Sequence, residues 1–484
     1  ALGVAGLITA SGGATIASSQ NFTMGGQATN DILISSDASS TSDTVLVTAG
    51  YVDAHAGGGG GGTIGGSLSD NHIPIGTAAN TIGNFVEGLT ENNSIWIGSD
   101  PSSVTDTASD NTAVGLNALD SVTTGDFNTI MGRNAGTAIT TGEMNTYFGA
   151  AAGGQATTSS YNTFFGYNAA GTGTRGNQNV GMGYYAMSIN QGINNVAMGL
   201  NAMQGEAGAD NDESVGIGAY ALRNISGTAD MNTAVGYAAM QGAGTGITSA
   251  GQYNVAVGNR AMSGLTSGYS NAALGRDALR TITGGYSNVA IGHQAGYSIS
   301  TGQKNVLVGN QAGFSMATGT GSVMIGEYAG GNNTNDYAIG IGFQALDANT
   351  SGDLNIAIGK DTLGANTTGN YNTVVGSNAL VSSVHGDGTV AVGYAALYSH
   401  VPADNTSKNV AIGFEAGYSS TTASYNTFVG YKAGRANTTA EENVYVGYLA
   451  GNANDAQYNV FIGNGAGEFA TGVQKSVFIG RQAA

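Results

Sequence analysis

One short sequence word recurs 23 times between Gly98 and Gly480, in forms such as NVAIGHQAG, NVLVGNQAG and NTFVGYKAG. Of the 22 intervals between successive marker glycines, 15 are 17 residues long. A unit this short cannot bury its own apolar face and must stack on its neighbours, as the units of a solenoid do. The sequence therefore predicts an all-β solenoid (a β-roll or β-helix) of about 23 coils of 17 residues each.

The residues before the marker glycine have the pattern of a short strand. Position −1, counted from the glycine, is apolar in every copy, and position −3 is Val, Ile or Thr in every copy except Ala272. Val289 and Ile291 before Gly292, and Ile412 before Gly413, are examples. Residues two apart share one face of a strand, and β-branched residues favour one, so we expect a strand of four to five residues in each coil.

Position −2 lies on the opposite face of that strand and is never strongly polar. It is Ala or Gly in 12 copies and aromatic in seven others. A strand that is apolar on both faces is buried on both faces, so a second surface must cover this one. We expect another copy of the chain, arranged around a three-fold axis, to cover it. The alternative is that each coil folds its own second strand over this face.

Three further positions of the repeat predict structural roles. Position −4 is Asn in 17 of 23 copies, including Asn288 and Asn409, and a column of Asn can hydrogen-bond from coil to coil and to turn backbone. Position +3 is nearly always Ala, as in Ala295 and Ala416, which indicates close backbone approach. Position +4 is often either Gly or a large Leu or Met, a choice that requires matching partners elsewhere in the coil.

The longest interval, between Gly236 and Gly258, holds the additional segment 241–248. We expect this insertion to bulge onto the surface without breaking the column of coils.

Composition divides the chain into four parts. Residues 1–56 lack the repeat and contain the strand-like pieces ATIA, DILISS and TVLVTA, followed by TAGYVDAHA, which could form a short helix. Residues 57–70 are a glycine-rich joint, and 71–97 are a degenerate capping coil and lead-in, where Pro74 suits an open edge. Residues 98–484 are the repeat shaft.

Charge and cysteine content exclude several classes of function. The formal net charge is −18, which speaks against binding to nucleic acid, because that requires a basic surface. The chain has no Cys, so disulfides and thiolate metal sites are impossible. No apolar stretch has the ~18 residues of a membrane helix, so we expect no membrane insertion.

The pattern of polar residues predicts no enzyme and neither a cofactor nor a metal site. Nucleophile elbows, phosphate loops and zinc-protease words are absent from the sequence. The acidic run Asp210–Glu213 is more typical of a solvated turn than of a calcium loop. The five histidines have no metal-ligand spacing: His55, His72, His293, His385 and His400. His385 and His400 flank the coil at Gly393, and we expect them to be solvated loop residues.

Many of the 23 tyrosines lie at the edges of coils, just before the Asn or just after the marker glycine. Tyr425 and Tyr431 represent the two positions, and we take them as candidate glycan contacts because exposed aromatic rings can stack on sugars. The alternative, that these rings cover the ends of the strands, is the more common arrangement.

The repeat word resembles two related groups of proteins. NVAIG at 288–292 and 409–413 is similar to the word of the left-handed β-roll head in trimeric autotransporter adhesins. The longer forms, NTAVGYAAM at 232–240 and TTGNYNTVVGSNAL at 367–380, more closely resemble the repeats of phage tail fibres.

This resemblance implies a homotrimeric tail fibre shaft of a virion. Residues 1–56 would attach it to the baseplate or another anchor, and the shaft would project a host-binding tip and contact a glycan or protein of the host surface. The alternative is a cell-surface adhesin or an extracellular filament subunit built on the same trimeric β-roll.

Overall fold

The computed structural model describes residues 32–35, 44–47, 88–98, 107–172, 176–206, 208–242, 246–248, 251–403 and 406–483. The chain divides into two compact units, residues 1–69 and 70–484. In the first unit, β1 (Ile32–Ser35) pairs antiparallel with β2 (Thr44–Val47), which confirms the strands predicted in DILISS and TVLVTA. The piece ATIA, the short helix, the glycine joint 57–70 and Pro74 lie outside the described residues.

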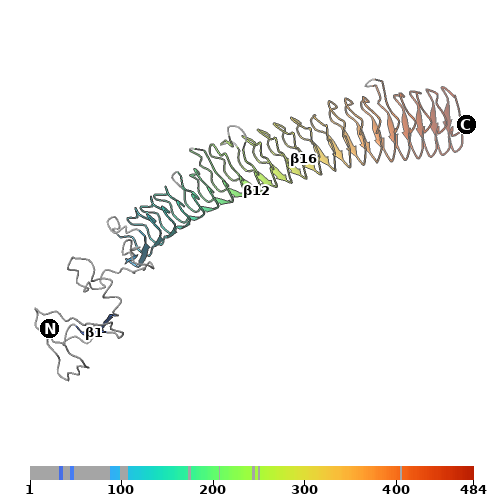
Figure 1. The fold of residues 1–484 in the computed structure, drawn as a ribbon. Coiled ribbons are helices and arrows are strands. Elements are labelled where there is room, and N and C mark those ends of the chain that lie inside the picture. The colour runs from blue at the N-terminus through green and yellow to red at the C-terminus, as the bar shows by residue number, and fades with distance from the viewer. Residues whose placement is uncertain are drawn as a thin grey trace, which may run out of the picture. The chain divides into compact units, whose positions relative to one another are not determined.

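The second unit is a parallel β-solenoid of about 22 turns, as the repeat predicted, and its described residues include no helix. Each strand pairs with the next at equivalent positions of the repeat, for example Val289 with Val306 and Ile291 with Val308 (Figure 1). After β4 (Ser94–Ile97), the strands of successive coils are β5 (Thr112–Val114), β6 (Thr129–Met131), β7 (Thr146–Phe148), β8 (Thr163–Phe165), β9 (Val180–Met182), β10 (Val196–Met198), β11 (Val215–Ile217), β12 (Thr233–Val235), β13 (Val255–Val257), β14 (Ala272–Leu274), β15 (Val289–Ile291), β16 (Val306–Val308), β17 (Val323–Ile325), β18 (Ile339–Ile341), β19 (Ile356–Ile358), β20 (Thr373–Val375), β21 (Val390–Val392), β22 (Val410–Ile412), β23 (Thr427–Val429), β24 (Val444–Val446), β25 (Val460–Ile462) and β26 (Val477–Ile479).

A hairpin that the repeat did not reveal covers the first edge of this sheet. β3 (Gly88–Glu91) pairs antiparallel with β4, and Asn92 and Asn93 connect them with φ of 47° and 59°. Two consecutive left-handed residues are the geometry of a tight type I′ hairpin turn, for which Asn is well suited. The dipeptide Asn-Asn between GLTE and SIWI is the sequence signal for this turn. The hairpin satisfies the otherwise open edge of β4.

The two faces of the strand are the reverse of what we expected. Position −2 points into the coil of its own chain, where Ala290, Leu307 and Phe428 are completely buried. Positions −3 and −1 point outward, and Ile291 remains 41% exposed. The prediction that a partner chain covers position −2 is therefore wrong. The alternative is nearer the truth, although turns and bends, rather than a second strand, close each coil over this face.

The interior is filled by a size match between positions −2 and +4. Where position −2 is large, as in Tyr147, position +4 is Gly153, on which an added Cβ would lie 2.2 Å from the tyrosine ring. Where position −2 is Ala256, position +4 is Met262, and both are completely buried. Position +4 thus has the matching partner that its small-or-large choice predicted. Ala and Gly at position −2 reflect this sharing of a narrow interior, because a close-packed core leaves no room for two large side chains.

The Asn column forms the predicted ladder inside the coils. Asn288 donates from Nδ2 to Oδ1 of Asn271 at 3.0 Å and to the carbonyl of Gly302 at 2.8 Å. Its own Oδ1 accepts from the backbone N–H and Nδ2 of Asn305, at 3.1 and 3.0 Å. Asn409 is likewise completely buried and donates to the carbonyl of Ala423. In coils such as these, the buried amide accepts from the Asn of the next coil and donates to a turn carbonyl.

The marker glycine and the Ala at position +3 mark the tightest approach between coils. Gly292 has φ of 137°, and an added Cβ would lie 2.3 Å from the carbonyl oxygen of Gly309. Gly413 is in the same position against Gly430, at 2.2 Å. Ala295 and Ala416 are completely buried, in agreement with the close approach expected at that column.

The insertion between Gly236 and Gly258 leaves the column of coils unbroken, because β12 and β13 still pair in register. Ile247, however, is completely buried and forms an isolated parallel bridge with Ile225. The expectation that the whole insertion bulges onto the surface is therefore wrong at Ile247. This apolar side chain extends the interior of the widened coils.

Candidate binding surfaces of the solenoid

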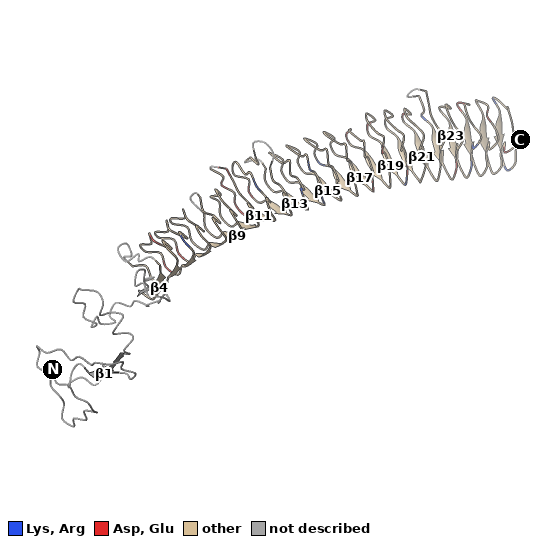
Figure 2. Ribbon diagram, viewed as in Figure 1, with Lys and Arg blue, Asp and Glu red and all other residues tan. Residues whose placement is uncertain are grey.

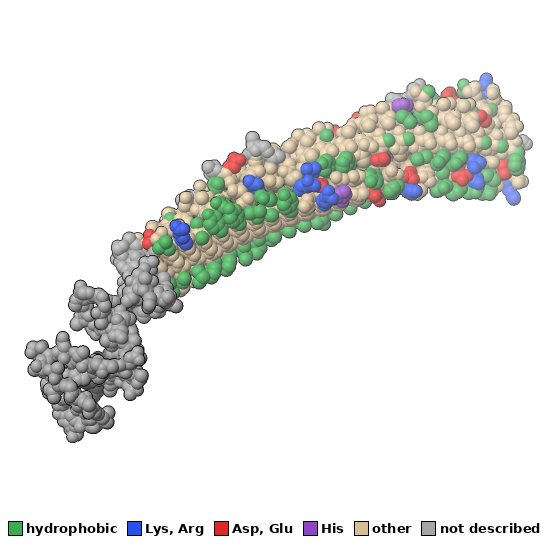
Figure 3. Space-filling view, viewed as in Figure 1, with side chains coloured by type: hydrophobic (Ala, Val, Ile, Leu, Met, Phe, Trp, Pro, Cys, Tyr) green, Lys and Arg blue, Asp and Glu red, His purple; other side chains and the backbone are tan. Residues whose placement is uncertain are grey.

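The outer face of the strands forms an extended, mainly apolar surface, which we call the strand-face stripe: Ile95 and Ile97 of β4, and the first and third residues of β5–β26. Its most exposed members include Phe165 (44%), Leu274 (51%) and Ile291 (41%). Figure 3 shows a band of hydrophobic side chains along one edge of part of the described coils. No member of the stripe is charged. A single chain thus leaves an apolar, charge-free surface in every coil.

Tyrosines border the stripe on both sides. Tyr425 precedes β23 and is 48% exposed, whereas Tyr431 follows it and is 39% exposed. The two side chains therefore stand at opposite ends of one strand, and the structure does not bring them together as one site. Each has a lysine close to its ring: Nζ of Lys408 lies 5.6 Å from the centre of the Tyr425 ring, and Nζ of Lys432 lies 5.0 Å from that of Tyr431.

Tyr431 belongs to an aromatic ladder, and Tyr425 does not. The rings of Tyr394, Phe414, Tyr431 and Tyr448 stack in successive coils with centroids 5.2 to 5.5 Å apart. In a ladder of this kind the flat faces of the inner rings are occupied, and only their edges reach solvent. The ladder thus supports the interpretation that Tyr431 covers strand ends.

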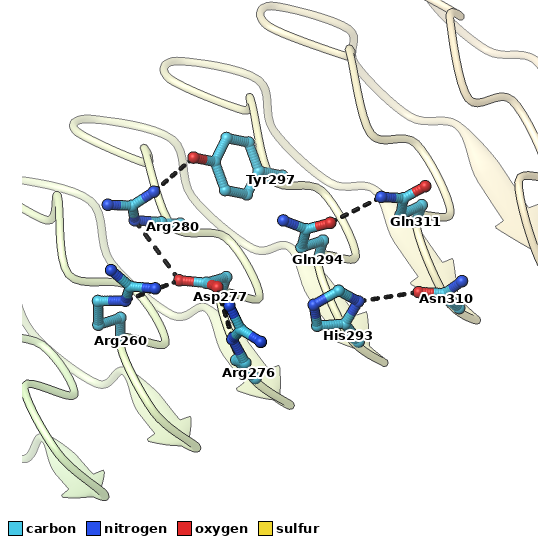
Figure 4. A network of polar contacts seen from close by, with 9 residues as sticks. All are labelled: Arg260, Arg276, Asp277, Arg280, His293, Gln294, Tyr297, Asn310 and Gln311. Atoms are coloured by element: carbon cyan, nitrogen blue, oxygen red, sulfur yellow. Dashed lines mark hydrogen bonds and ion pairs between the residues drawn. The ribbon is translucent and has the colours of Figure 1, made fainter.

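Three arginines from two neighbouring coils converge on one buried carboxylate (Figure 4). Nε of Arg260 and Nε of Arg276 each lie 3.1 Å from an oxygen of Asp277, and Nε of Arg280 lies at 3.5 Å. The Asp277 side chain is 2% exposed, whereas those of the three arginines are 34 to 60% exposed. One carboxylate cannot neutralise three guanidinium groups, so the cluster has an excess of positive charge on the surface.

Sequence reasoning missed this cluster, although a signal for it exists. Between Asp230 and Glu327, the only acidic residue is Asp277, against four basic residues, while the chain as a whole is strongly acidic. The four are Arg260, Arg276, Arg280 and Lys304. Figure 2 shows how sparse charges of either sign are along the coils.

An open pocket of about 320 Å³ lies a few coils further along, lined by Gln311, Phe314, Tyr328, Gly331, Asn332, Gln344 and Asp347. Burial raises the pKa of the Asp347 carboxyl. Aromatic, amide and carboxylate residues thus line one hollow, a combination that is typical of small-molecule sites.

The acidic run at 210–213 takes part in backbone hydrogen bonds. Asp212 accepts from the backbone N–H of Ile193 at 2.6 Å, and Asp230 accepts from that of Asp212 at 3.0 Å. Burial, together with the nearby Asp212 and Asp230, raises the pKa of Asp210. Asp212 thus links neighbouring coils, a structural role.

The histidines differ in their surroundings, and two of them, His55 and His72, lie outside the described residues. His293 is exposed, with Nδ1 3.0 Å from Oδ1 of Asn310, and His385 is half-buried. His400 is completely buried, so the expectation of a solvated His400 is wrong.

His400 occupies a break in the Asn ladder. Its Nε2 lies 2.6 Å from Oγ of Ser407, which is 2.6 Å from Oγ1 of Thr389, the residue that replaces Asn at position −4. Burial lowers the pKa of His400 to about 4. The inserted residues of this coil therefore supply the polar partners that the missing Asn would otherwise provide.

Comparisons with protein-family models, with curated proteins and with solved structures found no match to this chain. Within the described residues, no three or more His, Cys, Asp or Glu side chains are grouped so as to hold a metal ion. The described part of the chain also includes no helix of the length and hydropathy needed to cross a membrane. The surfaces above are therefore the basis for any proposal about function.

Proposed function

We propose that the chain is the shaft subunit of a virion tail fibre, which assembles side by side with copies of itself as a homotrimer. Residues 1–56 attach it to the baseplate or another anchor, and the shaft projects a host-binding tip and contacts the host surface. The observation that carries this proposal is the strand-face stripe, which the single chain leaves exposed from β4 to β26.

The extent of the stripe supports assembly with a second copy of the same chain. Monomeric soluble proteins rarely expose apolar patches of more than a few hundred Å². With one side chain such as Ile291 or Leu274 exposed by about two-fifths to one-half in many coils, the stripe exposes on the order of 1,000 Å², comparable to one side of a stable interface.

The repeat also supports identical partners in parallel register. Because every coil presents the same kind of strand face at the same spacing, a copy aligned coil by coil buries all of them at once. The chain has a formal net charge of −18, so copies repel one another except along a surface without charge. A closed ring of three chains would bury each stripe around one axis. The resemblance of the repeat word to phage tail fibres points to the same number.

Sedimentation of the purified full chain tests the assembly. We expect the mass of three chains, and we expect Ile291→Glu combined with Ile325→Glu to reduce it to one chain while the far-ultraviolet spectrum of the strands persists. The matched control is Leu354→Glu, because Leu354 is 47% exposed and lies outside the stripe, at the column where Glu442 occurs naturally. A wild-type monomer, or equal effects of stripe and control variants, would contradict the proposal.

Immunogold electron microscopy tests the virion assignment separately. An antibody against the chain is expected to label fibres that project from virus particles. Label confined to cell surfaces, with no particles decorated, would instead favour the adhesin or filament interpretation.

A further inference from the structure

The pocket at Gly331 exists because an aromatic ladder stops there. Position +5 of successive coils is Arg280, Tyr297, Phe314, Gly331 and Asp347. The rings of Tyr297 and Phe314 stack with centroids 5.1 Å apart, and the Arg280 guanidinium lies 5.5 Å from the centre of the Tyr297 ring. One face of Phe314 is therefore covered by Tyr297. The other faces the coil of Gly331, where no side chain follows.

The hollow of about 320 Å³ between Phe314 and Asp347 is called the slot below. The Asp347 carboxylate reaches into it, because one of its oxygens lies close to the place that a Cβ on Gly331 would take. The slot is bordered by the side-chain amides of Gln311, Asn332 and Gln344. Within the described part of the chain, no side chain donates a hydrogen bond or forms an ion pair to the Asp347 carboxylate. A flat apolar wall with free hydrogen-bond acceptors and amides beside it suits a sugar ring, which has an apolar face and a rim of hydroxyl groups.

The arginine cluster lies in the same columns of the repeat as this slot. Arg260 and Asp277 occupy position +2, as do Gln294 and Gln311, whose side chains hydrogen-bond at 2.7 Å. Figure 4 shows the arginines, Tyr297 and the two glutamines on adjacent coils. Arg280 and Phe314 are two coils apart, which at the spacing of paired strands is about 10 Å. A chain of a few linked sugars can therefore contact both.

We propose that these coils form a binding site for an acidic polysaccharide. A neutral sugar ring occupies the slot between Phe314 and Asp347, and an anionic group of a neighbouring sugar binds the exposed sides of Arg276 and Arg280. The Asp347 carboxylate accepts hydrogen bonds from hydroxyl groups of the neutral sugar and repels an anionic one. The order of groups along the coils thus selects a polymer in which charged and uncharged sugars alternate.

The inference rests on the proposed function only in bringing the shaft to a host surface, and its binding chemistry is independent of the virion assignment. This site differs from the glycan contacts expected at Tyr425 and Tyr431, where no gap in an aromatic ladder is observed.

Calorimetric titration of the full-length protein with defined polysaccharides tests the site. Hyaluronan oligosaccharides alternate carboxylated and neutral sugars, chondroitin sulfate adds sulfate groups, and dextran is neutral. We expect saturable binding of at least one charged polymer and none of dextran. The stronger of the two charged polymers identifies carboxylate or sulfate as the preferred anion. Failure of both to bind, or equal binding of dextran, would overturn the proposal.

Variants locate the binding. Gly331→Tyr continues the ladder into the slot, in a column that accepts Tyr297 and Tyr418 elsewhere, and we expect it to abolish binding. At Gly331, an added Cβ closely meets only the flexible Asp347 carboxylate, so this variant should fold. Phe314→Ala and Arg276→Gln should each weaken binding about tenfold or more, since each removes one anchor of the ligand.

Lys304→Gln is the matched control, because it removes the same charge from the same basic segment. Lys304 precedes β16 and lies 6.0 Å from the ring of Tyr286, beyond the opposite end of the strands. The affinity of Lys304→Gln for the polysaccharide should equal that of the wild type. If Lys304→Gln lost as much affinity as Arg276→Gln, the binding would be explained by non-specific attraction between charges. Sedimentation of the same samples separates this test from the assembly test: a changed mass in Arg276→Gln would show that the arginines serve the subunit interface instead.

Discussion

Ala290 and Ile291 are neighbours in β15, yet they belong to two surfaces with different properties. Ala290 is completely buried by its own chain, whereas Ile291 keeps 41% of its surface exposed. Inside most coils, a large side chain at position −2 or +4 has a compensating small one at the other position, as Tyr147 has Gly153, and every Asn at position −4 has an Asn, Ser or Thr in the next coil. On the outer face, apolar residues repeat along the coils and nothing in the described part of the chain covers them.

The difference separates stability from assembly. Because the interior is complementary within each chain, the stacking of coils is a property of one polypeptide and depends mainly on nearest neighbours. The outer face acquires a role only when a second surface covers it. Substitutions inside should therefore destabilise the coils, whereas substitutions outside should change what the protein binds.

The largest loss of stability is expected at the closest approach between coils. Gly292→Val forces a branched side chain into a left-handed backbone and against the carbonyl of Gly309, and should cost about 4 kcal/mol or more. Thermal unfolding measures this loss. The control is Gly284→Ala, where an added Cβ meets only Ser267 Oγ at 3.4 Å. Equal stability of the two variants would show that the coils are not in contact at the marker glycines.

A smaller loss is expected from a break in the Asn ladder. Asn288→Ala leaves the carbonyl of Gly302 and two donors of Asn305 without their partner, and should cost about 3 kcal/mol. Denaturant unfolding measures the change. Asn288→Ser should cost less, because Ser322 at the same position accepts from the backbone N–H of Ala338 at 3.2 Å. A neutral Asn288→Ala would mean that water reaches this column.

His400 makes the stability of its coils depend on pH. Its pKa of about 4 in the folded chain lies below the ordinary value of 6.5, so the unfolded chain binds the proton more tightly. The contribution of neutral His400 to the free energy of unfolding is fully present above pH 6.5 and is lost as the pH falls towards 4. The loss amounts to about 3 kcal/mol. Hydrogen exchange of the coil around Gly393 should report this loss, and His400→Gln should remove it. A loss that persists in that variant would place the titrating group elsewhere.

The smallest effects are expected among the exposed rings. Tyr431→Ala removes the stacking contacts with Phe414 and Tyr448 and should lower the free energy of unfolding by about 1 kcal/mol. Tyr425→Ala removes only the contact with Lys408 and should cost about 0.5 kcal/mol or less. Thermal unfolding distinguishes the two, and a larger loss from Tyr425→Ala would contradict the ladder account.

The sequence alone was sufficient for the repeat, its strand and the ladder of Asn288, because each follows from one column read along the chain. It was insufficient for the direction in which the strand faces. Ala290 beside Ile291 is compatible with either side being the interior. The deciding information is the size match between position −2 and position +4, as in Tyr147 with Gly153. This match can be recognised only once both side chains are known to point into the same coil.

The local sites escaped prediction for a related reason. Arg260 lies 17 residues before Asp277 and meets it because position +2 of one coil lies beside position +2 of the next, whereas Arg280 follows Asp277 by three residues in the same coil. The slot at Gly331 exists because an aromatic ladder lacks a ring at that coil. A search for exposed tyrosines such as Tyr425 and Tyr431 cannot detect a missing ring. His400 is buried because an insertion widens its coil at the point where Thr389 interrupts the Asn column.

Single cysteines at two adjacent positions test the central claim most directly, since the chain has no cysteine of its own. We would introduce Ala290→Cys or Ile291→Cys, treat the folded protein with a short bis-maleimide and separate the products on a denaturing gel. Ile291→Cys should yield covalent pairs of chains, because equal positions of the strand-face stripe meet between copies. Ala290→Cys should be neither linked nor labelled, because its own coil buries it. Linked chains from Ala290→Cys, or an Ile291→Cys protein that is labelled but never linked, would contradict the account.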